Sequence, residues 1–106
     1  MGIFDFIRHS DINYELEEYR AIPEAVLVDV RTPQEYSEGH IPGSINVPLH
    51  ALSQIEYHVA ETDVPLYVYC RSGARSSRAA GILGALGYDK VKNIGGINSY
   101  TGELAV

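Results

Sequence analysis

The chain has 106 residues, a net charge of −6, 45% hydrophobic residues and 21% charged residues, which is the composition of a soluble globular protein. Its single cysteine excludes an intrachain disulfide and any zinc or dithiol site that needs paired cysteines. The sequence has no basic run and no long apolar segment, so we expect no nucleic-acid partner, no membrane partner and a cytoplasmic location. We expect residues 1–106 to form one domain, in which residues 1–9 are an apolar N-terminal leader.

The charge is unevenly distributed along the chain. Residues 1–63 carry twelve acidic and three basic side chains, whereas residues 64–106 carry two acidic and five basic ones. No Asp or Glu occurs between Val64 and Tyr88. This segment can therefore attract a small anion although the whole protein is acidic.

The first elements are a helix and a strand. Ser10 or Asp11 can cap a helix that runs through Tyr19, and Pro23 ends that region. Residues 25–30 are apolar and rich in β-branched side chains, which predicts a buried strand of a parallel sheet.

A capping box marks the next helix. In Thr32-Pro33-Gln34-Glu35, Thr32 takes the N-cap, proline the first helical position and Glu35 the third, and Gly39 ends the helix. Residues 44–47 predict a short strand. Residues 49–59 predict a helix with three apolar side chains facing inward: Leu52, Ile55 and Val59.

The second half repeats the alternation. Residues 64–69 predict a buried strand, and residues 76–86 predict an amphipathic helix closed by Gly87. Residues 91–94 predict a last strand, followed by a tight loop at Gly95-Gly96 and a helical turn within residues 98–103. Strands that alternate with helices indicate an α/β domain with a mainly parallel sheet.

Cys70 lies between a predicted strand end and a predicted helix start. Unpaired N–H groups and the positive end of a helix dipole lower the pKa of a thiol in such a position. Arg71, Arg75 and Arg78 add positive charge around it. The pattern predicts a cysteine nucleophile that binds an anion.

Four motifs in this order resemble the rhodanese (sulfurtransferase) family, and the resemblance covers almost the whole chain. They are Leu27–Arg31 leading into Glu35-Tyr36, Glu38–Pro48, Val68–Ser76 and Asn93–Gly96. The resemblance implies a three-layer α/β/α domain with a mainly parallel five-stranded sheet. One departure is Tyr100, where many relatives have tryptophan; this affects packing rather than chemistry.

The resemblance also implies the reaction. The Cys70 thiolate would take the outer sulfur of thiosulfate or of a persulfide donor, hold it as a persulfide and pass it to a thiol or cyanide. The donor would be held by the rest of a six-residue loop: Arg71, Ser72, Gly73, Ala74 and Arg75. The implied partners are a small anionic sulfur donor, a thiol acceptor, or a protein that gives or takes the sulfur. No metal or organic cofactor is expected.

Several conspicuous residues have structural interpretations. A lone cysteine is usually a small buried hydrophobe, but a glycine-containing, arginine-rich loop favours a nucleophile here. Arg78 is expected in a structural salt bridge to Asp29, and Asp29 with Arg31 is expected to tie the strand end to the following turn. His40, in a His-Ile-Pro-Gly turn, is expected to bond to the backbone.

Two other functions remain as alternatives. A phosphatase or arsenate reductase of the same fold has a Cys-x5-Arg loop, whereas here arginine follows after four residues and no second cysteine exists. A non-catalytic binding or regulatory module is the other alternative, and its discriminating feature is an unreactive Cys70.

Overall fold

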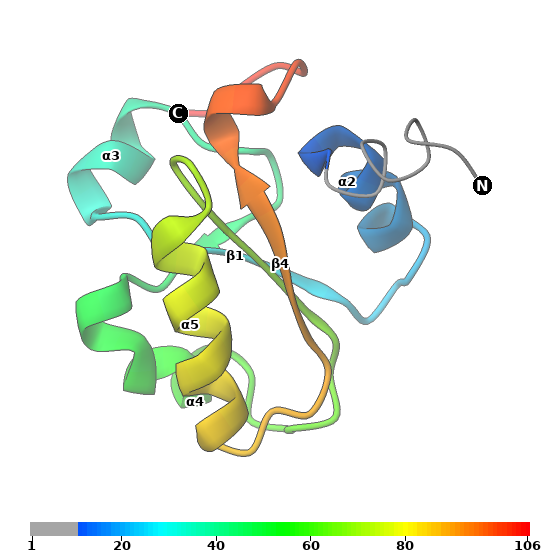
Figure 1. The fold of residues 1–106 in the computed structure, drawn as a ribbon, viewed down its shortest axis with the longest axis vertical. Helices are drawn as coiled ribbons and strands as arrows, with labels where there is room; N and C mark the ends of the chain where they lie inside the picture. The colour runs from blue at the N-terminus through cyan, green and yellow to red at the C-terminus, as the bar shows by residue number, and fades with distance from the viewer. Residues whose placement is uncertain (1–10) are drawn as a thin grey trace.

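The computed structural model describes residues 11–106 (Figure 1), so the apolar leader over residues 1–9 lies outside the described part. In chain order the elements are α2 (Ile12–Arg20), β1 (Val26–Asp29), α3 (Pro33–Glu38), β2 (Ile45–Asn46), the 3₁₀ helix η1 (Leu49–Gln54), α4 (Ile55–His58), β3 (Leu66–Cys70), α5 (Ala74–Ala85), β4 (Val91–Gly96) and the 3₁₀ helix η2 (Ile97–Ser99). Within the described residues, no helix has the length and apolar character needed to cross a membrane.

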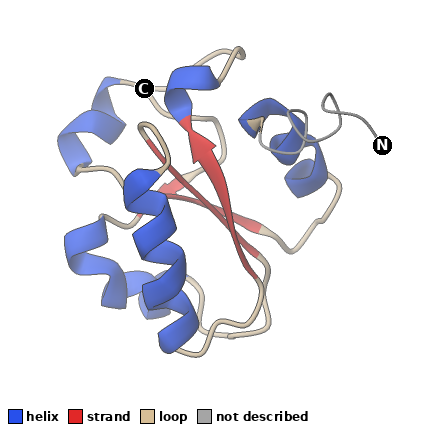
Figure 2. Ribbon diagram, viewed as in Figure 1, coloured by secondary structure: helices blue, strands red, loops and turns tan. Residues whose placement is uncertain are grey.

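The strands form one parallel sheet in the order β2-β1-β3-β4. Figure 2 shows α2 on one side of this sheet and α4 and α5 on the other, so the three-layer α/β/α arrangement is confirmed. All four strands that the residue pattern predicts are present. The fifth strand is not: the described part of the chain contains four.

Outside the four strands, residues 11–106 contain one isolated β-bridge, between His40 and Ala105. These residues exchange both backbone hydrogen bonds, His40 N–H to Ala105 at 2.9 Å and Ala105 N–H to His40 at 2.8 Å. The bridge is antiparallel. Gly39, directly before His40, has a φ of +154°, and Gly43, three residues after it, has a φ of +90°. The extended conformation that a longer ladder needs stops at these glycines and at Pro42, which has no N–H to donate.

Alternation along the central strands divides the core into two clusters. The cluster on the α5 side, called the α5-side core, contains Val28, Val30, Val47, Leu52, Ile55, Val59, Leu66, Val68, Cys70, Ala79, Leu83 and Tyr88. The cluster on the α2 side, called the α2-side core, contains Ile12, Leu16, Leu27, Ile41, Tyr67, Tyr69 and Ile94. In β3 the two clusters alternate residue by residue, as the two-residue period of a strand requires. Cys70 therefore faces α5.

The helix predicted over residues 49–59 is wrong in its type and continuity. A 3₁₀ helix covers Leu49–Gln54, with a kink at Ala51 (φ −130°, ψ 33°), and a short α-helix covers Ile55–His58. Leu49, Leu52 and Ile55 recur every third residue and pack on the α5-side core. Residues three apart share a face in a 3₁₀ helix and in an α-helix alike, so the apolar spacing does not distinguish the two; the non-helical backbone at Ala51 is what interrupts the helix.

The remaining terminal features follow the sequence closely. Asp11 is the N-cap of α2, and its carboxylate accepts the Asn13 N–H. The capping box of α3 is complete, with Gly39 at its end. Gly87 has a φ of +106°, and Tyr88 N–H returns to the Leu83 carbonyl to close α5. The expected turn over residues 98–103 is reduced to η2.

Gly95 and Gly96 belong to β4 and do not form the predicted tight loop. The pairing of β3 with β4 shifts register between Val68 and Tyr69, and Gly95 takes a φ of +105° at this bulge. Gly96 has ordinary extended backbone (φ −125°) but no room for a side chain. A Cβ at Gly96 would overlap the Arg71 carbonyl oxygen and lie 2.5 Å from the Cα of Ser72. The chain after β3 therefore lies directly on the backbone of β4.

An ion pair joins α3 to α5 across the carboxyl end of the sheet. Arg75 donates to both carboxylate oxygens of Glu35, at 2.8 and 3.0 Å. The same carboxylate accepts the Thr32 backbone N–H at 2.9 Å, which is its part in the capping box. Glu35 therefore fixes both the start of α3 and the first turn of α5.

The close approach at Gly96 predicts a large difference between two glycine-to-alanine changes. Gly96→Ala should lower the free energy of unfolding by about 1–3 kcal/mol, because the added methyl group overlaps backbone that must move. Gly81→Ala in α5 is the control: nothing lies within 4 Å of its Cβ position, and alanine in a helix should add about 0.5–1 kcal/mol. Chemical denaturation measures both. A Gly96→Ala variant as stable as the parent would contradict the close contact.

The Glu35 pair predicts a pH-dependent contribution to stability. The hydrogen bonds from Arg75 lower the pKa of Glu35 from 4.5 to about 2; burial opposes this shift and the bonds from Thr32 support it. A carboxyl group with a depressed folded-state pKa stabilises the fold above its unfolded pKa, and this stabilisation is lost as the pH falls from 4.5 towards 2.

Glu35→Gln keeps the oxygen that the capping box uses and removes the charge. Near neutral pH the variant should lose about 1.5–3 kcal/mol of unfolding free energy, as for a hydrogen bond to a charged group. Its stability should also fall less steeply on acidification. Denaturation at a series of pH values tests this, and parallel curves for the variant and the parent would overturn it.

Candidate active site

Strand β3 ends at Cys70, and the chain enters α5 after residues 71–73. Gly73 precedes the helix with a φ of +107°, a left-handed conformation that glycine adopts without strain. The predicted position of Cys70 between a strand end and a helix start is therefore confirmed. Residues 70–75 are called the Cys70 loop below.

The sulfur is enclosed by groups of this loop and of the first turn of α5. The backbone N–H of Gly73 donates to Sγ of Cys70 at 3.0 Å, and the Ser76 hydroxyl lies 3.4 Å from Sγ. The Cys70 residue is only 1% exposed. The sulfur is thus a member of the α5-side core and also the acceptor of a backbone hydrogen bond.

Two opposing effects set the ionisation of this thiol. Burial raises the pKa of Cys70, because the thiolate loses contact with water. Hydrogen bonds from the Ser76 hydroxyl and from the backbone N–H groups of Ser76, Gly73 and Ser72 act in the opposite direction. Together they outweigh burial and hold the pKa of Cys70 below its ordinary value. The site can therefore supply a thiolate.

The arginines take different positions. Arg75 is committed to Glu35, as described above, whereas Arg71 is 63% exposed in its side chain and only 3.8 Å from Glu35. Arg78 is exposed on α5. The predicted ion pair between Arg78 and Asp29 is wrong, because Asp29 is paired with Arg31 at 2.7 Å.

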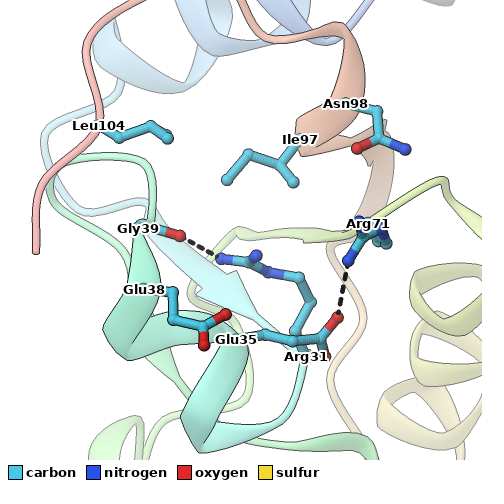
Figure 3. A pocket seen from close by; sticks show the side chains of 8 residues that line it. All are labelled: Arg31, Glu35, Glu38, Gly39, Arg71, Ile97, Asn98 and Leu104. Carbon is cyan, nitrogen blue, oxygen red and sulfur yellow. Dashed lines mark hydrogen bonds and ion pairs between the residues drawn. The ribbon is translucent and has the colours of Figure 1, made fainter.

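Two pockets lie beside the Cys70 loop, each of about 360 Å³. The first, shown in Figure 3, is lined by Arg31, Glu35, Glu38, Gly39, Arg71, Ile97, Asn98 and Leu104. In Figure 3 the guanidinium of Arg71 points at Glu35 from the opposite wall. The second is lined by Val30, Thr32, Pro48, Leu49, His50, Arg75, Arg78 and Ile82. Arg71 and Arg75 therefore meet at Glu35 but line different pockets.

Three polar residues near the site have the structural contacts expected of them. The carboxylate of Asp29 accepts the backbone and side-chain N–H groups of Arg31 at about 3 Å, and Arg31 also donates to the Gly39 carbonyl at 2.7 Å. Nδ1 of His40 lies 2.8 Å from the Tyr36 carbonyl oxygen. Tyr100 packs against the α2-side core, which agrees with a packing role at that position.

Sequence reasoning missed Ser76, which contacts the sulfur, and Asn93, which contacts Ser76. Ser76 is fully buried, and its hydroxyl lies 2.6 Å from Oδ1 of Asn93 on β4 as well as near Sγ. Ser72 and Ala74, which the resemblance implies as donor-binding, are exposed beside them. Ser76 could have been found from its position in the sequence, because it lies in the first turn of the helix that follows the cysteine. Asn93 had no such signal.

Metal binding finds no support in the described part of the chain. Residues 11–106 contain no group of three or more His, Cys, Asp or Glu side chains arranged to hold an ion.

Comparison with known proteins gives relatives along most of the chain. A Bacillus subtilis protein named uncharacterized protein YqhL is 41% identical over 90 residues, covering 83% of this chain and 71% of its own. The thiosulfate sulfurtransferase PspE of Escherichia coli is 38% identical over 71 residues, covering 66% of this chain and 68% of its own. Among solved structures, a rhodanese with anions from E. coli has a TM-score of 0.71 at 33% identity, covering 76% of this chain and 96% of its own.

A comparison with protein-family models gives a match over most of the chain. The model of the rhodanese-like domain matches residues 13–103, which includes every described strand and the whole Cys70 loop. On this match, and on the relatives above, the chain belongs to the rhodanese-like domain family.

Proposed function

We propose that the protein is a rhodanese-type sulfurtransferase in which Cys70 carries the transferred sulfur. The observation that supports this most directly is the Gly73 N–H, which donates to Sγ of Cys70 at 3.0 Å from the start of α5. A backbone donor aimed at the only sulfur of the Cys70 loop stabilises negative charge there without any rearrangement. The similarity to a thiosulfate sulfurtransferase supports the same reaction class.

The proposed reaction has two displacements. The Cys70 thiolate attacks the outer sulfur of thiosulfate, an S–S bond forms, and the S–S bond of the donor breaks with sulfite leaving with the electron pair. The product is a cysteine persulfide. A thiolate or cyanide then attacks the outer sulfur of that persulfide, and Cys70 leaves as thiolate. The low exposure of Cys70 favours donors whose transferable sulfur is a small terminal atom.

The Cys70 loop is the proposed donor site. Arg75 is close enough to Cys70 for the thiolate charge to contribute to the raised pKa of its guanidinium, although the bonds to Glu35 are the main cause. Arg71, Ser72, Gly73 and Ala74 complete the loop. For a thiol acceptor, or for a partner protein that supplies or removes sulfur, the supporting observation is the two pockets that Arg71 and Arg75 line.

The same pairing argues against phosphatase chemistry. A phosphatase loop needs its arginine free to bind the oxygens of a phosphate in bidentate fashion. Here both terminal nitrogens of Arg75 already bind Glu35. The non-catalytic module is the remaining alternative, and the next experiment decides against it or for it.

Trapping the intermediate is the direct test. Protein treated with excess thiosulfate and desalted without reductant should be one sulfur atom heavier by intact mass spectrometry, with the added mass on the Cys70 peptide. The adduct should persist, because the chain has no second cysteine that could remove the sulfur. Added glutathione should then remove it. Cys70→Ser is the control and should show neither the adduct nor transfer of sulfur to cyanide. If no donor gives an adduct or turnover in the parent protein, the binding module replaces the enzyme.

The arginines give a second, independent prediction. Arg75→Ala should raise the KM for thiosulfate severalfold, because it removes a positive charge close to Cys70 that attracts the anionic donor, although both terminal nitrogens of Arg75 are bound to Glu35 in the parent protein. Arg78→Ala, an exposed arginine less than one turn further along α5, is the matched control and should change KM little. Steady-state kinetics with cyanide as acceptor measures both. A larger effect from Arg78→Ala in a folded protein would reverse the assignment.

A further inference from the structure

The Ser76 hydroxyl is surrounded by four atoms that can accept a hydrogen bond. They are Oδ1 of Asn93 at 2.6 Å, the Gly73 carbonyl oxygen at 3.1 Å, the Gly95 carbonyl oxygen at 3.4 Å and Sγ of Cys70 at 3.4 Å. A serine hydroxyl has one hydrogen to donate and two lone pairs to accept with. Ser76 is fully buried, so water does not compete for that hydrogen.

The orientation of the Asn93 amide is fixed by its other contacts. Oδ1 accepts the Gly95 backbone N–H at 3.0 Å, and the amide nitrogen lies 3.4 Å from the Gly73 carbonyl oxygen. Oδ1 is therefore an acceptor towards Ser76. Of the four neighbours, only the Cys70 thiol carries a hydrogen that it can give to the Ser76 oxygen.

Two arrangements follow for the two ionisation states of Cys70. With a thiol, S–H donates to Ser76 and the Ser76 hydroxyl donates to Asn93. With a thiolate, the Ser76 hydroxyl can rotate and donate to Sγ. Asn93 tolerates this change, because its Oδ1 keeps the bond from Gly95 N–H and is not left unpaired in a buried place.

We infer that Ser76 is a catalytic residue of the sulfur-transfer reaction, whose hydroxyl turns from Asn93 to Cys70 whenever Sγ carries the negative charge. The inference rests on the proposed function. Sγ is charged twice in the cycle, as the attacking thiolate in the donor step and as the leaving thiolate in the acceptor step. In the persulfide between them the charge is on the outer sulfur, and the hydroxyl can return to Asn93.

Other charged groups around the sulfur are committed elsewhere or exposed. Asp29 on β1 is paired with Arg31, and Glu35 on α3 is paired with Arg75 of α5. Arg71 is exposed. On β4 the groups that face Ser76 are the uncharged Asn93 and Gly95. Ser76 thus differs from all of them in touching Sγ directly with a rotatable donor.

Removal of the hydroxyl should affect the two half-reactions in opposite ways. A thiolate of higher pKa is intrinsically a better nucleophile but a poorer leaving group. In Ser76→Ala, at a pH where Cys70 is fully ionised, the donor step should therefore be unchanged or faster by up to about severalfold. Release of sulfur from the preformed persulfide should be slower. A merely distorted loop would slow both steps.

The experiment has one readout that needs no sulfur donor. The rate of Cys70 alkylation by iodoacetamide against pH should give a pKa that is about one to two units higher in Ser76→Ala than in the parent. Ser77→Ala, the exposed neighbour on α5, is the control and should leave the pKa unchanged. Ser76→Thr keeps a hydroxyl and serves as the second variant, which should retain the low pKa.

The half-reactions are then measured by single-turnover mixing, with thiosulfate for loading and glutathione for release. An unchanged alkylation pKa in a folded Ser76→Ala protein overturns the inference, and so does an equal slowing of both half-reactions. If the pKa rises as expected but the parent protein never forms a persulfide, the proposed function fails while the contact between Ser76 and the thiolate stands.

Discussion

The backbone of the Cys70 loop lies directly on the backbone of β4 at Gly96, and this contact leaves no space for a side chain. The contact has three consequences. It holds the loop against the sheet, it allows the Asn98 N–H to bond to the Arg71 carbonyl at 3.1 Å, and it brings Asn93 within reach of the start of α5. A site built on loop backbone is precise only if that backbone has a fixed support, and here the support is another strand.

The sheet also determines which way the sulfur points. The two-residue period of β3 places Val68 and Cys70 towards α5 and Tyr69 towards α2. Tyr69 then uses its hydroxyl to accept the Ile41 N–H at 3.1 Å, so the two faces of one strand serve different purposes. One face presents the nucleophile to a helix N-terminus, and the other ties down the turn after α3. A one-residue slip of register would exchange them and destroy both.

The sequence was sufficient for features that depend on neighbouring residues and insufficient for those that join distant ones. The capping box of α3, the four strands, Gly87 after α5 and the position of Cys70 all follow from local patterns, and the structure has them. The contact of Ser76 with Asn93 joins residues 17 apart, and that of Arg75 with Glu35 joins residues 40 apart. Glu35 illustrates the difficulty: its place in the capping box already accounted for a glutamate, so nothing in the sequence indicated its second role. The prediction of a continuous helix over residues 49–59 failed for a different reason: apolar residues three apart fit an α-helix as well as a 3₁₀ helix, so the pattern gave no sign of the break at Ala51.

Cys70 belongs to the α5-side core as well as to the site, and this has a consequence for survival under oxidising conditions. A cysteine oxidised to sulfenic acid is usually rescued by a neighbouring thiol that forms a disulfide, before further oxidation becomes irreversible. This chain contains no second cysteine to do so. What remains is the packing: a sulfur that is 1% exposed and contacted by the Gly73 N–H and the Ser76 hydroxyl is shielded from bulky oxidants. The packing that orients the Cys70 sulfur therefore also limits the size of the oxidants that can reach it.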